Sequence, residues 1–290
     1  MTRSHRRDRQ SRKPGKRLLG IVAACVVVVT VVLVISLSGG GSAVTFPDPN
    51  LEAAIREAIG KPTGHIYEYD LETLTALDAP GQLESQTNIE DLSGLQYCSN
   101  LADLNLELHG NISDLSPLSA LTNLTALDLW HNQISDISPL GNLTKLTYLE
   151  LGDNEIIDIS PLGNLTELEY LYLYSNQIVD ISSVANLTNL TSLSLQYNQV
   201  EDISPLAGLT NLIGLDLWYN QITDISPLAN LTSLTYLYLP RNQISDISPL
   251  VDNAGLLGGA EVYLSGNPLS SDSINIHIPQ LQARGVTVDY

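Results

Sequence analysis

The sequence predicts a curved repeat solenoid of the α/β class, with a parallel sheet along its concave side and a cap at each end. Three observations support this fold class. The segment 124–145, LTALDLWHNQISDISPLGNLTK, recurs with a period of 22 residues. Leucine or isoleucine fills almost every apolar position of each copy. One asparagine per copy keeps its place, as Asn132, Asn154, Asn176, Asn198, Asn220 and Asn242.

The repeat pattern is L-x-x-L-x-L-x-x-N-x-I-x-D-I-S-P-L-x-x-L-T-x, which is typical of leucine-rich repeats. A single unit cannot bury its apolar face alone, so the units must stack around one continuous core. Alternating leucines predict one inward-facing strand per repeat. We expect repeats over residues 101–271, with His109 replacing the asparagine in the first, and a concave sheet of eight strands.

The charge is distributed unevenly along the 290 residues, whose net charge is −19. Residues 1–17 hold 8 of the 13 Lys and Arg and 1 of the 32 Asp and Glu, which leaves −26 on the remainder. An acidic surface repels nucleic acid, because that binding requires phosphates to be neutralised. We therefore exclude nucleic acid as a partner and expect either a protein ligand with a basic surface or a role of the charge in solubility.

The N-terminal residues predict a membrane attachment. Residues 1–17 are interpreted as a basic cytoplasmic tail and residues 18–37, which lack charge, as a transmembrane signal-anchor helix. Residues 38–45 form an expected flexible linker. This arrangement places the repeats outside the cytoplasm as part of a single-pass protein. Two alternatives remain: cleavage after Ala43, which would give a secreted protein, and lipid attachment at Cys25.

Residues 46–100 are expected to form an N-terminal cap and a degenerate repeat. A capping helix is predicted within 46–60, because Asp48 suits the N-cap and Pro49 the first helical position. A second short helical piece is predicted over 70–79. Cys98 is expected to be a small buried hydrophobe. Residues 272–290 are assigned to a C-terminal cap.

Two polar positions recur for reasons that we expect to be structural. The asparagine after each strand can satisfy backbone groups that would otherwise be buried without partners. The aspartate of each Asp-Ile-Ser-Pro segment can cap a bend, and Ser-Pro suits entry into a short helical turn. A ladder of calcium ions along these aspartates is the alternative, which is disfavoured because each repeat offers one carboxylate there and calcium takes six to eight oxygens.

Functional residues are sought at positions that the repeat leaves variable around the strand leucines. Both tryptophans and nine of the thirteen tyrosines fall there. Packing across neighbouring strands explains some of them, but exposed aromatics beside acids are more typical of a binding surface. The predicted partner-binding residues are Asp128, Trp130, His131, Tyr148, Glu150, Tyr170, Tyr172, Tyr174, Tyr197, Asp216, Trp218, Tyr219, Tyr236, Tyr238 and Arg241.

The sequence gives little support for catalysis or for a cofactor. The histidines are scattered without metal-ligand spacing, and no nucleophile motif or phosphate-binding glycine loop is present. His131 near Asp128 and Asp153 is the one acid–base grouping. We therefore expect no enzyme activity, no cofactor and no metal.

The repeat residues, together with the helical cap at 48–60, resemble the leucine-rich repeat region of the bacterial internalins over residues 44–290. The resemblance implies a solenoid whose concave face grips a protein, which is a host-cell receptor in the best-known members. This sequence departs from them in lacking an immunoglobulin-like domain after the repeats and a cell-wall sorting signal. A role in host invasion is therefore not expected.

These observations lead to one functional prediction and two alternatives. We expect a membrane-tethered, extracytoplasmic leucine-rich repeat protein that binds a protein partner through an aromatic, acidic concave face. A glycan-binding module of the cell surface is the first alternative, because flat aromatic side chains also stack on sugars. A structural envelope scaffold is the second.

Overall fold

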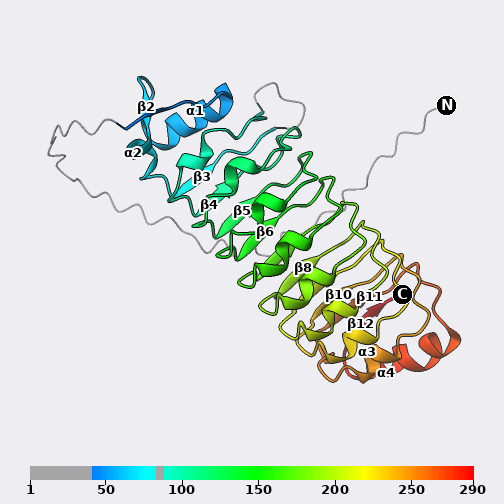
Figure 1. Cartoon of the computed structure of the whole chain (residues 1–290). Coiled ribbons are helices and arrows are strands. Elements are labelled where there is room, and N and C mark those ends of the chain that lie inside the picture. Colours follow the sequence, from blue (N-terminus) through cyan, green and yellow to red (C-terminus); the bar gives the residue numbers. More distant parts are fainter. Residues whose placement is uncertain (1–40, 83–87) are drawn as a thin grey trace, which may run out of the picture. The chain divides into compact units, whose positions relative to one another are not determined.

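The computed structural model describes residues 41–82 and 88–290 (Figure 1). The predicted cytoplasmic tail 1–17, the predicted anchor helix 18–37 and the first part of the linker lie outside the described residues and remain predictions. No helix in the described ranges is both long and apolar enough to cross a membrane. Residues 41–290 make up one compact unit.

The N-terminal cap begins with a small antiparallel pair, β1 (Ala43–Val44) with β2 (Ile66–Tyr67), on either side of helix α1 (Pro49–Ala58). A helix forms where the sequence predicted one, with Asp48 as its N-cap residue, while its role as a cap of the repeat core stays a prediction. The Asp48 carboxylate accepts hydrogen bonds from the first backbone N–H groups of α1, which no carbonyl of the helix can satisfy. The helix buries Leu51 and Ile55 against the core.

The prediction of a second helix over 70–79 is wrong for most of its length. Helix α2 covers only Glu68–Leu71, and β3 (Ala76–Asp78) is a strand. Its central residue Leu77 pairs with Leu104 of the next strand, in the same register as the strand leucines of the repeats. Pairing with the repeat sheet therefore outweighed the helical spacing of the leucines in this segment.

The main sheet is parallel and holds ten strands, in the order β12 to β3 (Figure 1). The expected eight is too low, because β3 and β12 of the two caps each add one strand. The remaining strands are β4 (Asp103–Asn105), β5 (Ala126–Asp128), β6 (Tyr148–Glu150), β7 (Tyr170–Tyr172), β8 (Ser192–Ser194), β9 (Gly214–Asp216), β10 (Tyr236–Tyr238), β11 (Glu261–Tyr263) and β12 (Thr287–Asp289).

The return side of the repeats consists of short 3₁₀ helices. Those in the repeats begin at the serine that follows each Asp-Ile or Asp-Leu pair, as the sequence predicted. These are η2 (Ser116–Leu118), η3 (Ser138–Leu140), η4 (Ser160–Asn164), η5 (Ser182–Asn186), η6 (Ser204–Gly208) and η7 (Ser226–Asn230). Helix α3 (Ser248–Asp252) replaces the next one. In the half-repeat before η2, η1 (Leu95–Tyr97) begins two residues after the corresponding serine, Ser93. The C-terminal cap adds the π-helical turn η8 (Ser273–His277) and α4 (Ile278–Ala283).

The aspartates of the return side act as local caps. In each case one carboxylate oxygen accepts a hydrogen bond from the serine N–H two residues later, at 2.8 Å. The predicted structural role is therefore confirmed for Asp114, Asp136, Asp158, Asp180, Asp202, Asp224 and Asp246. Among the described residues, no group of three or more His, Cys, Asp or Glu could hold a metal ion.

The core is one continuous cluster that runs from the N-terminal cap to the C-terminal cap, and the strand leucines within it are almost fully buried. Cys98 belongs to this core, as predicted. Burial raises the pKa of its thiol to about 12, so the sulfur stays protonated and acts as a small apolar group.

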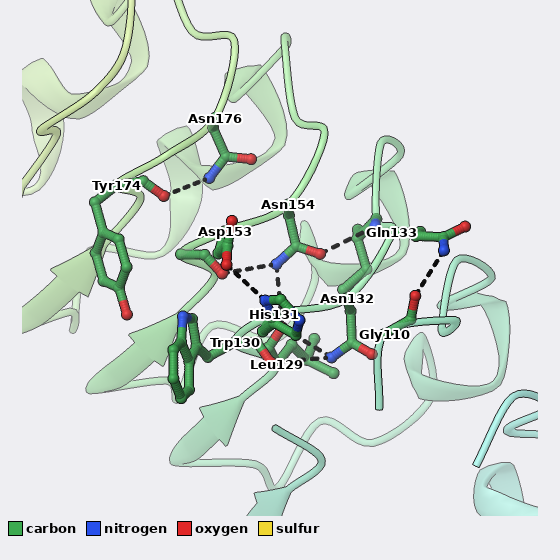
Figure 2. Close-up of polar contacts among 12 residues, drawn as sticks. Gly110, Leu129, Trp130, His131, Asn132, Gln133, Asp153, Asn154, Tyr174 and Asn176 are labelled. Atoms are coloured by element: carbon green, nitrogen blue, oxygen red, sulfur yellow. Dashed lines mark hydrogen bonds and ion pairs between the residues drawn. The ribbon is translucent and has the colours of Figure 1, made fainter. Parts of the chain in front are cut away.

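The asparagine of each repeat lies buried beside the turn that follows the strand (Figure 2). In the repeat of Asn154, the amide nitrogen donates to the carbonyls of Leu129 and Leu151, and the amide oxygen accepts from Ile134 N–H. One side chain thus joins two neighbouring repeats, which confirms the predicted structural role.

In the first repeat, His109 stands at the asparagine position and bonds to backbone groups of the segment before it. Its Nδ1 accepts a hydrogen bond from Ile89 N–H, and its Nε2 lies 2.8 Å from the Ala79 carbonyl oxygen, to which it donates. Burial lowers the pKa of His109, so the ring is held neutral with its proton on Nε2.

Candidate binding surface

The outward face of the main sheet, called the sheet face below, carries four rows of side chains. Strand leucines such as Leu127 and Leu149 point into the core, so their sequence neighbours point outward. Parallel pairing puts equivalent residues of successive repeats side by side. The first row is Ala76, Asp103, Ala126, Tyr148, Tyr170, Ser192, Gly214, Tyr236, Glu261 and Thr287.

The second row lies two residues further along each strand, and the third and fourth rows follow the strand ends. The second row is Asp78, Asn105, Asp128, Glu150, Tyr172, Ser194, Asp216, Tyr238, Tyr263 and Asp289. The third row is Glu107, Trp130, Gly152, Tyr174, Gln196, Trp218 and Pro240. The fourth row is Leu108, His131, Asp153, Ser175, Tyr197, Tyr219, Arg241 and Gly266.

Every predicted partner-binding residue belongs to one of these four rows, but the residues differ in exposure. Five are exposed, namely Tyr170, Tyr197, Tyr219, Tyr236 and Arg241. Nine are partly buried, namely Asp128, Trp130, His131, Tyr148, Tyr172, Tyr174, Asp216, Trp218 and Tyr238. Glu150 is buried, and its carboxylate accepts a hydrogen bond from Gly152 N–H. Glu150 is therefore less accessible than the other predicted residues, and its role in partner binding stays a prediction.

The structure groups the aromatic rings into three clusters. In the first, Tyr148 lies 6.4 Å from Tyr170 and 5.9 Å from Tyr172, measured between ring centroids. The second consists of Tyr197, 4.8 Å from Trp218 and stacked on Tyr219 at 5.1 Å. In the third, Tyr238 stacks on Tyr263 at 4.3 Å. Tyr263 was not among the predicted site residues, although its place in the repeat is equivalent to that of Tyr238.

Tyr174 packs directly over Gly152, in the third row. A Cβ at Gly152 would collide with the tyrosine ring, so the glycine makes room for it. Burial, followed by repulsion from the carboxylates of Glu150 and Asp128, raises the pKa of Tyr174 above its usual range. Trp130 projects on the same side of the turn (Figure 2), and its Nε1 is covered without a hydrogen-bond partner among the described residues.

The fourth row has an unusual backbone conformation that the sequence did not reveal. Its seven non-glycine residues have positive φ, between 53° and 65°. The left-handed conformation costs roughly 1–2 kcal/mol in a residue with a Cβ. Gly266 occupies the equivalent position in the last repeat, also with positive φ. His131 and Asp153 are neighbours in this row, and His131 Nδ1 contacts the Asp153 carboxylate (Figure 2).

The predicted residues form a surface rather than a pocket. Two open depressions of about 500 and 510 Å³ lie elsewhere, one between α1 and β3 and one beside the starts of the central strands. Neither is lined by a predicted binding residue. A broad face with aromatic clusters suits a macromolecular partner better than a small ligand, which is usually held in a concave pocket.

Comparison with known proteins shows what this architecture resembles. A family model described as "Leucine Rich repeats (2 copies)" matches residues 122–164, 166–208 and 210–252. The chain is similar to internalin C2 from Listeria monocytogenes, known from a crystal structure, with 38% sequence identity and a TM-score of 0.68. The match covers 79% of this chain and 98% of the internalin C2 chain. Internalin F from the same organism is 34% identical, with a TM-score of 0.54, covering 84% and 88% respectively.

A more distant similarity involves a receptor solved with its ligand. The plant peptide hormone receptor RGFR1, in complex with RGF2, is 25% identical with a TM-score of 0.56. That match covers 70% of this chain and 34% of the receptor chain. The curated proteins gave no match.

Proposed function

This chain belongs to the bacterial internalin-like leucine-rich repeat proteins, and from that premise we propose that it binds a protein partner through its sheet face. Proteins of this type are binding scaffolds rather than enzymes. The observation that carries the proposal is the placement of the aromatic side chains. Both tryptophans and nine of the thirteen tyrosines lie in the four rows of one face.

The exposure of these rings supports binding over simple packing. Tyr236, Tyr219, Tyr170 and Tyr197 are 50%, 49%, 41% and 39% exposed, although three of them, Tyr170, Tyr197 and Tyr219, contact other aromatic rings. Tyrosine and tryptophan dominate the energetics of protein interfaces. The similar plant receptor was solved with a peptide hormone bound, which is a precedent for a leucine-rich repeat array that binds a polypeptide.

Serine substitutions at three exposed tyrosines test the proposal with little risk to the fold. The chain itself places Ser192 in the row of Tyr170 and Tyr236, and Ser175 in the row of Tyr219. We expect the triple variant Tyr170→Ser, Tyr219→Ser, Tyr236→Ser to bind the partner at least about 100-fold more weakly, since interface tyrosines can each contribute more than 1 kcal/mol.

The measurement begins with crosslinking capture of a partner by residues 41–290, followed by titration of the purified partner. Tyr97→Ser is the matched control, because Tyr97 is 42% exposed but lies in η1, away from the sheet face. Unchanged affinity in the triple variant would refute the proposal. A ligand that survives protease treatment and appears on a glycan array would indicate the glycan-binding module instead. The absence of any ligand would favour the envelope scaffold.

We further propose that residues 18–37 tether the repeats to the cell membrane, with the repeats outside the cytoplasm. The support is the uncharged run itself and its basic N-terminal flank. Val27→Arg combined with Val28→Arg should release the full chain from the membrane fraction, because each arginine costs about 2.5–3.5 kcal/mol at the centre of a spanning helix. If the double-arginine variant stayed in the membrane fraction after alkaline washing, as the parent should, the proposed tether would be contradicted.

A further inference from the structure

The sheet face is polarised along the stack of strands, and parallel pairing is what brings its charges together. The first four strands, β3 to β6, with the turns that follow β4 to β6, carry six acidic residues in the four rows. These are Asp78, Asp103, Glu107, Asp128, Glu150 and Asp153. The same strands and turns carry no lysine or arginine in these rows. This group of residues is called the acidic half below.

Strands β7 to β10 and their turns have a different character. They carry one acid, Asp216, and one base, Arg241, in the four rows. Their aromatic residues are Tyr170, Tyr172, Tyr174, Tyr197, Trp218, Tyr219, Tyr236 and Tyr238. These strands are called the aromatic half. Beyond them, Glu261 of β11 is engaged by the Tyr263 hydroxyl, which donates to its carboxylate.

Basic side chains of the described residues lie outside the four rows, apart from Arg241 in the aromatic half. Lys61 pairs with Asp70, and Arg56 pairs with Glu52, both within the N-terminal cap. Lys145, in the segment before β6, donates to the side chain of Asn123, in the segment before β5. In the acidic half, the one group that can become cationic is His131, which contacts Asp153.

The carboxylates of the acidic half influence one another. Loss of hydration and repulsion from Asp78 together raise the pKa of Asp103. Repulsion from Asp128 and Glu150 also adds to the effect of burial on the pKa of Tyr174. Negative potential therefore accumulates over these strands, where Trp130 and Tyr148 present rings to which a cation is attracted.

We propose that this polarity fixes the orientation of the protein partner: a segment bearing lysine or arginine lies over the acidic half, and an apolar segment lies over the aromatic half. The inference rests on the proposed function. Charge complementarity supplies the direction, because opposite potentials steer the encounter and the wrong orientation would bring a desolvated apolar segment onto carboxylates.

The chain contains two built-in reporters of this polarity. Its two tryptophans occupy equivalent third-row positions, Trp130 at the acidic half and Trp218 in the aromatic half. Their backbone settings match, because the backbone N–H of each donates to the aspartate two residues earlier: Trp130 N–H to Asp128 and Trp218 N–H to Asp216, both at 3.0 Å. Trp218→Tyr leaves only the first reporter and Trp130→Tyr only the second, and the chain itself uses Tyr174 in this row.

The experiment titrates hexalysine into each single-tryptophan form of residues 41–290, which form one compact unit and lack the basic tail that would compete. We expect saturable, salt-sensitive changes in Trp130 emission, at concentrations at least tenfold below any change in Trp218 emission. Hexaglutamate should change neither. Equal responses of the two tryptophans, or no response of Trp130, would overturn the proposal.

Charge-matched variants separate this site from the general acidity of the chain. The triple variant Asp103→Ala, Glu107→Gln, Asp153→Ser should weaken the Trp130 response at least tenfold. Each replacement is the residue that the chain places in the same row, at Ala126, Gln196 and Ser175. The control Asp136→Asn, Asp158→Asn, Asp180→Asn removes three charges from the return side. Equal weakening by the control would overturn the proposal.

Failure of the orientation can be distinguished from failure of the proposed function. If the tyrosine-to-serine variant loses the captured partner but hexalysine does not discriminate between the tryptophans, the sheet face binds the partner without the proposed orientation. If hexalysine discriminates between the two tryptophans but the captured partner still binds the tyrosine-to-serine variant, the proposal that the sheet face binds the partner fails. The acidic half then remains a cation-binding surface.

Discussion

At the scale of the residue, the repeat asparagine makes several buried hydrogen bonds to the backbone with one side chain. Asn198 donates to the carbonyls of Leu173 and Leu195, at 2.9 and 3.0 Å, and accepts from Ile178 N–H at 2.9 Å. All these groups are buried away from water. Leaving a buried backbone group without a partner costs about 1–3 kcal/mol.

Asn198→Ala should therefore lower the free energy of unfolding by roughly 1–3 kcal/mol, because the Ile178 N–H loses its partner. The carbonyls of Leu173 and Leu195 keep hydrogen bonds from Asn176 and Asn220. For a unit of this size the melting temperature should fall by roughly 2–12 °C. Thermal melting followed by circular dichroism measures the change. Asn189→Ala is the control, because Asn189 is exposed and donates to one carbonyl, that of Thr166. Similar losses in both variants would contradict the assigned role of Asn198.

The fourth row illustrates a cost that function can explain. Six of its eight members have side chains larger than serine and positive φ, and such strain usually persists where the side chain is needed. Glycine adopts this conformation without strain, as Gly266 does in the last repeat.

Reciprocal substitutions in this row should have opposite effects. Ser175→Gly is expected to stabilise the protein by about 0.5–1 kcal/mol, because relief of backbone strain exceeds the entropy that glycine loses on folding. Gly266→Ser should destabilise it by a similar amount, with its Cβ only 3.3 Å from Arg241 Cγ. The melting temperature of Ser175→Gly should be higher than that of the parent and that of Gly266→Ser lower, by about 2–4 °C for each 1 kcal/mol of change in the free energy of unfolding. Shifts in the same direction would show that φ does not control them.

At the scale of the element, Asp48 holds the N-terminal cap to the first half-repeat. One carboxylate oxygen accepts from Asn50 and Leu51 N–H at the start of α1, and the other from Glu90 and Asp91 N–H. Burial alone would raise the pKa of Asp48, but these hydrogen bonds outweigh it and the pKa lies below the usual value. The ionised form therefore joins two segments that are far apart in the sequence.

Asp48→Asn should destabilise the cap at neutral pH by about 1–3 kcal/mol, because an amide nitrogen cannot accept from Glu90 and Asp91. The lowered pKa means that the carboxylate contributes stability above its unfolded pKa, near 3.9, and that this contribution disappears as the pH falls through the folded pKa. The difference in melting temperature between parent and variant should therefore shrink below about pH 4. Glu57→Gln, on the exposed side of α1, is the control. A difference that is constant with pH would contradict this account.

At the scale of the whole molecule, each repeat contacts its neighbours in the stack, so stability is approximately a sum of repeat and interface terms. The 22-residue period keeps strands β5 to β10 in register with one another. The sheet face is consequently modular along the stack, although its two halves differ in charge. Removal of one whole repeat should preserve the packing of the remainder.

Deletion of residues 190–211 removes β8 and η6 and joins equivalent positions of two repeats. The product should fold and melt cooperatively at a somewhat lower temperature, because β7 can pair with β9 in the same register. Deletion of residues 190–200 alone removes half a repeat and should abolish cooperative melting, since the following leucines no longer face the core. Circular dichroism on both deletions tests this. Cooperative melting of the second product would show that register is not what holds the stack.

Much of the scaffold follows from the sequence alone. The period, the inward leucines, the asparagine ladder and the aspartate caps are repeated local patterns, and each was confirmed because neighbouring repeats supply identical surroundings. The capping helix was also predictable, since Asp48 and Pro49 act within one turn of chain. The predicted site residues all fall on the sheet face, but their exposure could not be determined from the sequence.

Tertiary structure decided whatever depends on segments distant in sequence. The strand β3 formed where local spacing predicted a helix, because Leu77 pairs with Leu104. Glu150 is buried on the sheet face, with its carboxylate bonded to the turn after β6. Parallel register gathered acids scattered between residues 78 and 153 into one half of a face and most of the aromatic residues into the other. The sequence by itself determined the repeating unit and its core, whereas stacking decided which variable side chains meet, because only pairing across repeats makes them neighbours.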